Sequence, residues 1–181
     1  MGLIDDVRDN ANASASDVTD AAIQRELERC RRMVRARLEW IPTQVGAGSV
    51  EYRVAYVKPW GFFEPGSAGG TNGTLNVGTI RNAVGSVVAG WDIDRDGYVN
   101  LGTALTSGSA YTLHTWSYDV NAASAAVLRA MAAEQTRQYD VDMSGDKGTR
   151  SQKYDKIMDL ARYYEARRLP RHVSWARTDE A

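Results

Sequence analysis

The stretch from Tyr118 to Arg168 constrains the fold most, because it predicts two helices joined by a short loop that contains glycine. The carboxylate of Asp119 can accept hydrogen bonds from the free amides at the start of the first helix. Thr149 and Gln152 have the spacing of a reciprocal capping box and predict the start of the second helix. Apolar or small residues recur at helical spacing at Ala123, Val127, Met131 and Tyr139, and again at Ile157, Leu160, Ala161 and Tyr164. We therefore expect a packed helical pair, with Met131 and Leu160 buried against each other's helices.

The N-terminal part of the chain predicts one further helix. Thr19 can cap a helix that runs to about Trp40, and Pro42 stops it. Its apolar row comprises Ile23, Leu27, Cys30, Val34 and Leu38. Arginines outnumber glutamates on its other faces, which indicates a solvated face or, less simply, a surface for an acidic partner. Residues 2–18 are polar and small and predict a flexible arm.

Between these helices the hydrophobic period changes to that of strands. Alternating residues predict strands at 50–57 and 111–118, and a glycine-broken run at 75–88 predicts further β-structure. Trp91 and Ile93 on one side of Asp94-Arg95-Asp96-Gly97, and Val99 and Leu101 on the other, predict a hairpin.

This order of elements predicts an α+β fold: a small helical bundle, made of the N-terminal helix and the C-terminal pair, with a β-rich insertion. We assign a flexible arm to 1–18, a single domain to 19–169 with the insertion at about 48–118, and an extended tail to 170–181. Pro170 marks the end of the last helix, and the tail beyond it carries Trp175, which has no core of its own to enter.

The helical pair also supports a family resemblance. The segment carries Tyr118-Asp119, Asn121 and Ala122-Ala123 at the start of its first helix and Arg150-Ser151-Gln152 at the start of its second. On these residues it resembles the C-terminal half of head-to-tail adaptor proteins. Those proteins lie between portal and tail in the connectors of tailed double-stranded-DNA bacteriophages. The resemblance covers about this third of the chain and the layout of the rest, since the family also has a helical bundle with a β-rich insertion.

The resemblance implies a structural virion protein, located in the connector or neck after synthesis in the host cytoplasm. Its partners would be the portal protein, neighbouring copies in a closed ring (a dodecamer in the virion) and the next tail or stopper component. It implies no catalysis, no cofactor and no membrane, and DNA would pass through the lumen without specific binding. In related adaptors the tail faces the portal, which assigns portal binding here to His172, Val173 and Trp175. A net charge of −1 suits a passage that must release DNA.

One motif points to metal instead. Asp92, Asp94 and Asp96 alternate before Gly97, and Asn100 follows at the ninth position, as in an EF-hand calcium loop. However, Thr103 occupies the twelfth position, where a bidentate carboxylate belongs, and no helix enters the loop. A hairpin turn explains the same residues and is the favoured interpretation. The alternative function is a calcium-stabilised β-rich module for adhesion or carbohydrate binding, with Trp60, Phe62, Trp91 and Trp116 as aromatic platforms.

No residue set indicates an active site. His114 and His172 are far apart in sequence and have no cysteine or carboxylate cluster at ligand spacing, so zinc is unsupported. The lone Cys30 is interpreted as a small buried hydrophobe. Trp60, Phe62 and Phe63 crowd a loop between two prolines, where they either tuck under the loop or face a partner.

Overall fold

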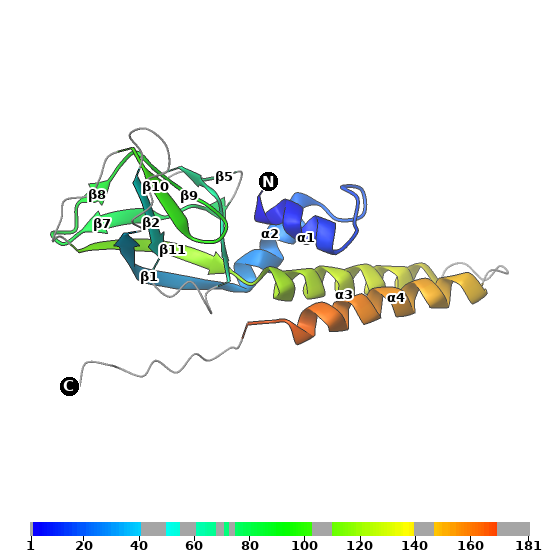
Figure 1. Cartoon of the computed structure of the whole chain (residues 1–181). Helices are drawn as coiled ribbons and strands as arrows, with labels where there is room; N and C mark the ends of the chain where they lie inside the picture. Colours follow the sequence, from blue (N-terminus) through cyan, green and yellow to red (C-terminus); the bar gives the residue numbers. More distant parts are fainter. Residues whose placement is uncertain are drawn as a thin grey trace, which may run out of the picture.

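The computed structural model describes residues 2–40, 50–54, 61–67, 71–72, 75–102, 110–139 and 147–169. A body of β-strands occupies one end of the molecule, and a long pair of helices projects from it toward the other end (Figure 1). Two short helices lie between them, against the base of this pair. The chain is therefore a mixed α+β protein, as the sequence predicts. None of the described helices combines the length and the apolar character that crossing a membrane requires.

The four described helices are α1 (Leu3–Asn10), α2 (Asp20–Arg29), α3 (Val120–Tyr139) and α4 (Lys147–Ala166). The strands are β1 (Arg31–Trp40), β2 (Val50–Val54), β3 (Phe62–Phe63), β4 (Gly66–Ser67), β5 (Thr71–Asn72), β6 (Leu75–Asn76), β7 (Thr79–Asn82), β8 (Val87–Val88), β9 (Trp91–Ile93), β10 (Tyr98–Leu101) and β11 (Tyr111–Tyr118).

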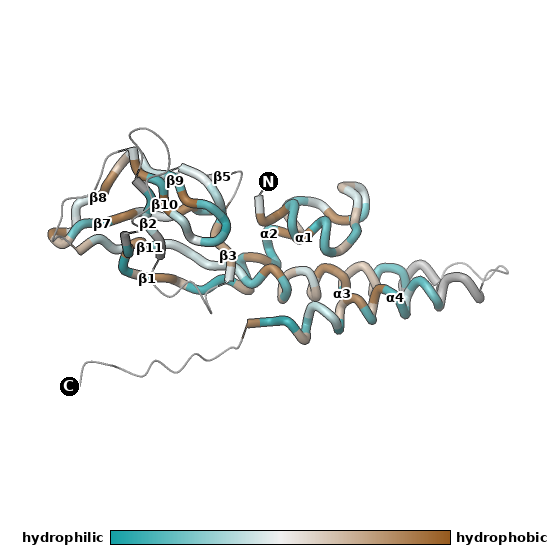
Figure 2. Tube along the Cα trace, viewed as in Figure 1, coloured by the Kyte–Doolittle hydropathy of each residue, from teal (hydrophilic) through white to brown (hydrophobic). Residues whose placement is uncertain are grey.

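The β body is built around β1, the longest strand. The order of strands in the main sheet is β4-β9-β10-β2-β1-β11-β7-β8, with β3 beside β11, and β5 and β6 form a separate pair. The first seven residues of β1 pair with β11 and its last three pair with β2, all antiparallel. Because β1 belongs to both halves of the sheet, it holds them in one register. Figure 2 shows hydrophobic and hydrophilic residues alternating along these strands, the pattern of strands with one buried face.

Two groups of buried apolar side chains hold the molecule together. The β core contains Val34, Ala36, Leu38, Tyr52, Phe63, Val77, Ile80, Trp91, Ile93, Val99, Leu101 and Leu113. The helical core joins α1, α2, α3 and α4 and contains Leu3, Val7, Ala11, Ile23, Leu27, Leu75, Tyr118, Val120, Ala123, Val127, Leu128 and Ala161. Leu75 and Tyr118 come from strands, so the second core also attaches the helices to the β body.

The predicted helix from Thr19 to Trp40 is half right. Thr19 does cap a helix, since its Oγ1 accepts a hydrogen bond from Ala22 N at 3.3 Å, but that helix ends at Arg29. From Arg31 onward the chain is a strand, with Val34, Ala36 and Leu38 pointing into the β core. The β-structure therefore starts well before position 48. These residues form a strand because they pair with β11. Since β11 lies far along the sequence, the local hydrophobic period does not reveal this partner.

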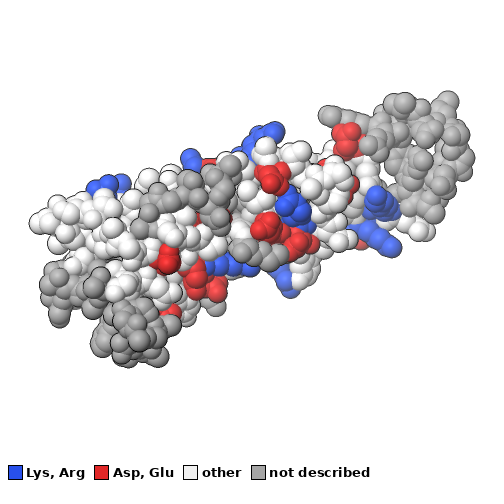
Figure 3. Space-filling view, turned by 90° about the horizontal axis from the view of Figure 1, so that it is seen from above, with Lys and Arg blue, Asp and Glu red and all other residues white. Residues whose placement is uncertain are grey.

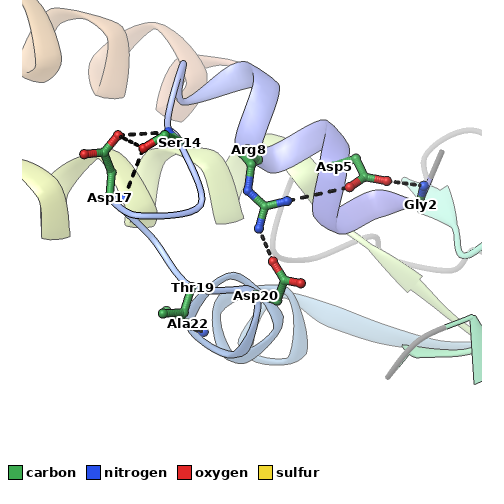
Figure 4. Close-up of polar contacts among 8 residues, drawn as sticks. All are labelled: Gly2, Asp5, Arg8, Ser14, Asp17, Thr19, Asp20 and Ala22. Carbon is green, nitrogen blue, oxygen red and sulfur yellow. Dashed lines mark hydrogen bonds and ion pairs between the residues drawn. The ribbon is translucent and has the colours of Figure 1, made fainter.

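The predicted flexible arm is also wrong over residues 3–10, which form α1. Leu3 and Val7 are fully buried in the helical core, because α1 packs against α3. Arg8 forms ion pairs with Asp5 and with Asp20 at the start of α2 (Figure 4). Seen from above, acidic and basic side chains are intermixed over the middle of the molecule (Figure 3). Helix α1 is ordered by contacts with distant residues, which its own composition does not reveal.

The C-terminal helical pair forms as predicted, with two differences. Helix α4 begins at Lys147, so Thr149 lies inside the helix and does not open it with a capping box. Met131 and Leu160 both pack against the helical core, but each is only half-buried. The predicted hairpin at 91–101 and the last strand at 111–118 are confirmed by β9, β10 and β11. The tail at 170–181 lies outside the described residues.

Candidate functional site

The helices meet the β body at a joint centred on Asp119. This residue follows β11 and precedes α3, and its Oδ1 accepts a hydrogen bond from Ala122 N at 3.0 Å, which confirms the predicted cap. Its backbone N–H donates to Cys30 O at 3.4 Å, where α2 passes into β1. Asp119 is almost fully buried, with 6% of its surface exposed. One side chain therefore lies where both one-residue connections between helix and strand come together.

The same carboxylate holds the segment that directly follows the last helix. Its Oδ2 accepts a hydrogen bond from Leu169 N at 2.8 Å, and the guanidinium of Arg32 donates to Leu169 O at 3.4 Å. Gly61 completes the contact: it has a φ of +91°, and a Cβ there would lie 2.9 Å from the Leu169 side chain and 2.6 Å from Tyr118 O. Leu169 is thus fastened at the joint, far from the tip of the helical pair.

Cys30, half-buried, lies beside this joint. Burial raises the pKa of its thiol, and the nearby Asp119 carboxylate raises it further. A thiol with a raised pKa is a poor nucleophile at neutral pH, so the geometry fits the structural role predicted for Cys30.

The three residues predicted to bind the portal, His172, Val173 and Trp175, lie outside the described residues, as does Trp60. What the structure does define is the point from which residues 170–181 continue, because Leu169 is held by Asp119 and Arg32. This anchoring was missed at the sequence level. Asp119 accepts hydrogen bonds from both Ala122 N and Leu169 N, and the second of these becomes visible only in the three-dimensional structure.

The Asp92–Asn100 motif forms a hairpin turn. Asp94 Oδ1 accepts hydrogen bonds from the backbone amides of Asp96, at 2.9 Å, and Tyr98, at 2.8 Å. Gly97 supplies the positive φ of +87° that the turn needs. Asn100 lies on β10, opposite Asp92 in the ladder, rather than in a coordinating loop. Within the described part of the chain no three His, Cys, Asp or Glu side chains form a group that could hold a metal ion.

The predicted aromatic loop divides into two environments. Phe63 is fully buried in the β core and pairs with β11, so it is not available to a partner, which corrects that assignment. Phe62 is half-buried beneath the guanidinium of Arg95, 4.2 Å from its ring centroid. Trp91, the proposed aromatic platform on β9, is also buried, and its Nε1 donates to Val88 O at 3.0 Å.

Arg95 links this region to α1. It pairs with Asp6 Oδ1 at 2.9 Å, and Leu3 N donates to Glu64 Oε2 at 3.2 Å. Burial raises the pKa of Asp6, an effect that Arg95 opposes and that Asp5 and Asp9 reinforce. Helix α1 is therefore bonded to the β body as well as packed on α3.

The most distinctive surface is the outer side of β1, β11, β7 and β8, which sequence reasoning missed. We call it the basic face, and its outward residues are Met33, Arg35, Arg37, Thr79, Arg81, Val87, Thr112, His114 and Trp116. Arg35, Arg37 and Arg81 are exposed, and no described acidic side chain pairs with Arg35 or Arg37. Burial lowers the pKa of His114, and the charges of Arg35 and Arg81 lower it further.

The signal for the basic face was present in the sequence as a period of two, in which Met33, Arg35 and Arg37 alternate with Val34, Ala36 and Leu38. The helical interpretation of the same residues concealed it. Comparisons of the chain with protein-family models, with curated proteins and with solved structures find no match.

Proposed function

We propose that this chain is a structural virion protein, a head-to-tail adaptor that forms a ring between the portal and the tail of a bacteriophage and lines the DNA passage. The proposal rests on the resemblance carried by residues 118–168. The protein would act through binding alone. The helical pair and the β body form the ring, and the segment after Leu169 docks on the portal.

The observation that carries the proposal is the anchoring of Leu169. Its backbone is held between Asp119 and Arg32 at the joint of the two halves of the molecule. These hydrogen bonds fix the residue from which the proposed docking segment continues, which supports the assignment of the portal contact to that segment. At the helical base the charge of Arg8 is paired with Asp5 and Asp20 instead of being left free for DNA phosphates.

The test is binding to a purified portal oligomer. A chain that ends at Leu169 keeps the hydrogen bond to Asp119 but lacks His172, Val173 and Trp175. We expect it to lose portal binding while its circular dichroism and urea midpoint stay unchanged. Trp175→Ala in the full chain should weaken binding on its own, because buried aromatic residues anchor interfaces. Unchanged portal affinity of the truncated chain would reject the assigned contact.

Location supplies an independent check. The protein should co-purify with intact virions, and gold-labelled antibodies should mark the neck between head and tail. The calcium-stabilised module is the competing function; it rests on the sequence motif from Asp92 to Asn100, whose carboxylates form no metal-holding group in the described part of the chain. It is distinguished by a calcium-dependent gain in melting temperature, because a ligand that binds only the folded state stabilises it.

A further inference from the structure

The basic face has the composition of a protein interface. Met33 and Val87 expose 56% and 58% of their surface among the three exposed arginines, and Trp116 is half-buried at the same face. Exposed methionine and arginine beside an aromatic residue are typical of protein–protein contacts, whereas a phosphate backbone makes no use of exposed apolar side chains. β11, β7 and β8 contain no acidic residue, and on β1 the acidic Glu39 lies beyond Arg37, near the end of the strand.

The complementary charge lies on the β9–β10 hairpin of the same chain. Asp92, Asp94 and Asp96 are exposed, and the intervening Arg95 is engaged by Asp6 and lies over Phe62. The tip of this hairpin is therefore negative. We call its three aspartates the acidic hairpin.

Spacing and position both fit contact between two copies. Arg35 and Arg37 are two residues apart on one face of β1, so they lie roughly 7 Å apart. Asp92 on β9 and Asp94 at the start of the turn have the same spacing in the sequence. In the sheet, β10 and β2 separate β9 from β1, and Figure 1 shows β9–β10 and β1–β11 on opposite sides of the β body. The two patches of one subunit therefore lie apart from each other, which fits a contact between the basic face of one copy and the acidic hairpin of another.

We propose that the basic face of one copy binds the acidic hairpin of the next, in a head-to-tail contact that repeats around an assembly. Contacts of this heterologous kind close into rings when the rotation between subunits allows it. The inference deepens the adaptor proposal and rests on it for the presence of neighbouring copies. Portal binding plays no part in the contact or in its test.

The experiment measures self-association of the full chain by sedimentation velocity at low salt, up to the solubility limit. We expect association that fades as sodium chloride is added, because salt screens exposed charges. Arg35→Glu with Arg37→Glu should weaken association by about 100-fold or more, and so should Asp92→Arg with Asp96→Arg, because like charges then face each other. Asp94 is left intact because it holds the turn.

Mixing supplies the decisive result. An equimolar mixture of the two double variants should associate again, because every contact between unlike copies then joins opposite charges. Arg25→Glu with Arg162→Glu, which makes the same charge change at exposed helical positions, should associate like wild type. Arg35→Gln with Arg37→Gln gives a milder variant, and an unchanged urea midpoint shows that each variant is folded.

Several outcomes overturn the proposal. These are a wild-type chain that stays monomeric throughout, double variants that associate normally, and a mixture that stays monomeric. A labelled DNA duplex that binds wild type but not the Arg35→Glu, Arg37→Glu variant, with self-association unchanged, would assign the basic face to phosphate instead. If self-association behaves as expected while the portal is not bound, the adaptor assignment fails and the contact between copies stands.

Discussion

Replacing Asp119 tests the joint, because its two carboxylate oxygens make two separable contributions. Oδ1 caps α3 through Ala122 N, and Oδ2 holds Leu169 N at 2.8 Å. Losing a helix cap costs about 1 kcal/mol. Losing a hydrogen bond to a charged acceptor costs about 1.5–3 kcal/mol, and the lower part of that range applies here because Leu169 is only half-buried.

Two substitutions separate these contributions. Asp119→Ser keeps a good capping oxygen and removes only the bond to Leu169, so its free energy of unfolding should fall by roughly 1.5–2 kcal/mol. Asp119→Ala removes both and should lose roughly 1 kcal/mol more. Urea unfolding at pH 7, followed by circular dichroism, measures both values. Amide hydrogen exchange at Leu169 should accelerate in both variants, whereas exchange at Ala122 should accelerate mainly in Asp119→Ala.

The control is Asp159→Ala, which removes an exposed aspartate from α4 and should change stability by less than about 0.5 kcal/mol. If Asp119→Ser leaves both the midpoint and the exchange of Leu169 unchanged, the carboxylate does not anchor the last helix. If Asp119→Ala is no less stable than Asp119→Ser, the cap contributes nothing, and the account of the joint is wrong.

Three further outcomes test the cores and the hairpin. Leu128→Ala should lower the free energy of unfolding by about 2–5 kcal/mol because Leu128 is enclosed, and Leu160→Ala should cost clearly less because Leu160 is half-buried; equal urea midpoints would contradict this description of the core. Asp92→Asn with Asp96→Asn should alter stability only slightly, and calcium should not raise the melting temperature of wild type; a rise of several degrees that the variant lacks would favour the metal module. Burial, reinforced by Glu28, raises the pKa of Tyr118 to about 12 from an ordinary value of 10.0, so the unfolded chain loses this proton first and stability falls as pH rises between those values. Tyr118→Phe should remove that fall in urea midpoints measured across the alkaline range, and an unchanged slope would show that Tyr118 is not the group responsible.

Elements with a complete local signal could be predicted from the sequence. Asp119 identifies the start of α3 by side-chain chemistry, and the β9–β10 hairpin carries both an alternating pattern and the glycine that its turn requires. Each of these signals depends on residues within a few positions of one another, so distant parts of the chain do not alter it.

Elements decided by distant partners could not be predicted. Val34 and Leu38 continue the helical spacing of Ile23 and Leu27, yet they also fit a period of two, and only the presence of β11 selects the strand. Leu3 and Val7 looked too sparse to order α1, because much of the surface that buries them belongs to α3, more than a hundred positions away. The basic face was missed for the same reason: its arginines come from β1 and β7, which lie on either side of β11 in the sheet.

The central position of β1 and β11 has a consequence for how the chain acquires its structure. The residues paired by this ladder, from Arg31 with Tyr118 to Arg37 with Thr112, are far apart in sequence, and every other strand of the main sheet lies between them in the chain. Closing so long a loop costs conformational entropy before any native contact repays it. We therefore expect slow folding for a chain of this size, with the sheet unable to close on the ribosome until β11 has left the exit tunnel. Helix α3 follows β11 directly, so the centre of the sheet and the base of the helical pair become available to fold almost together.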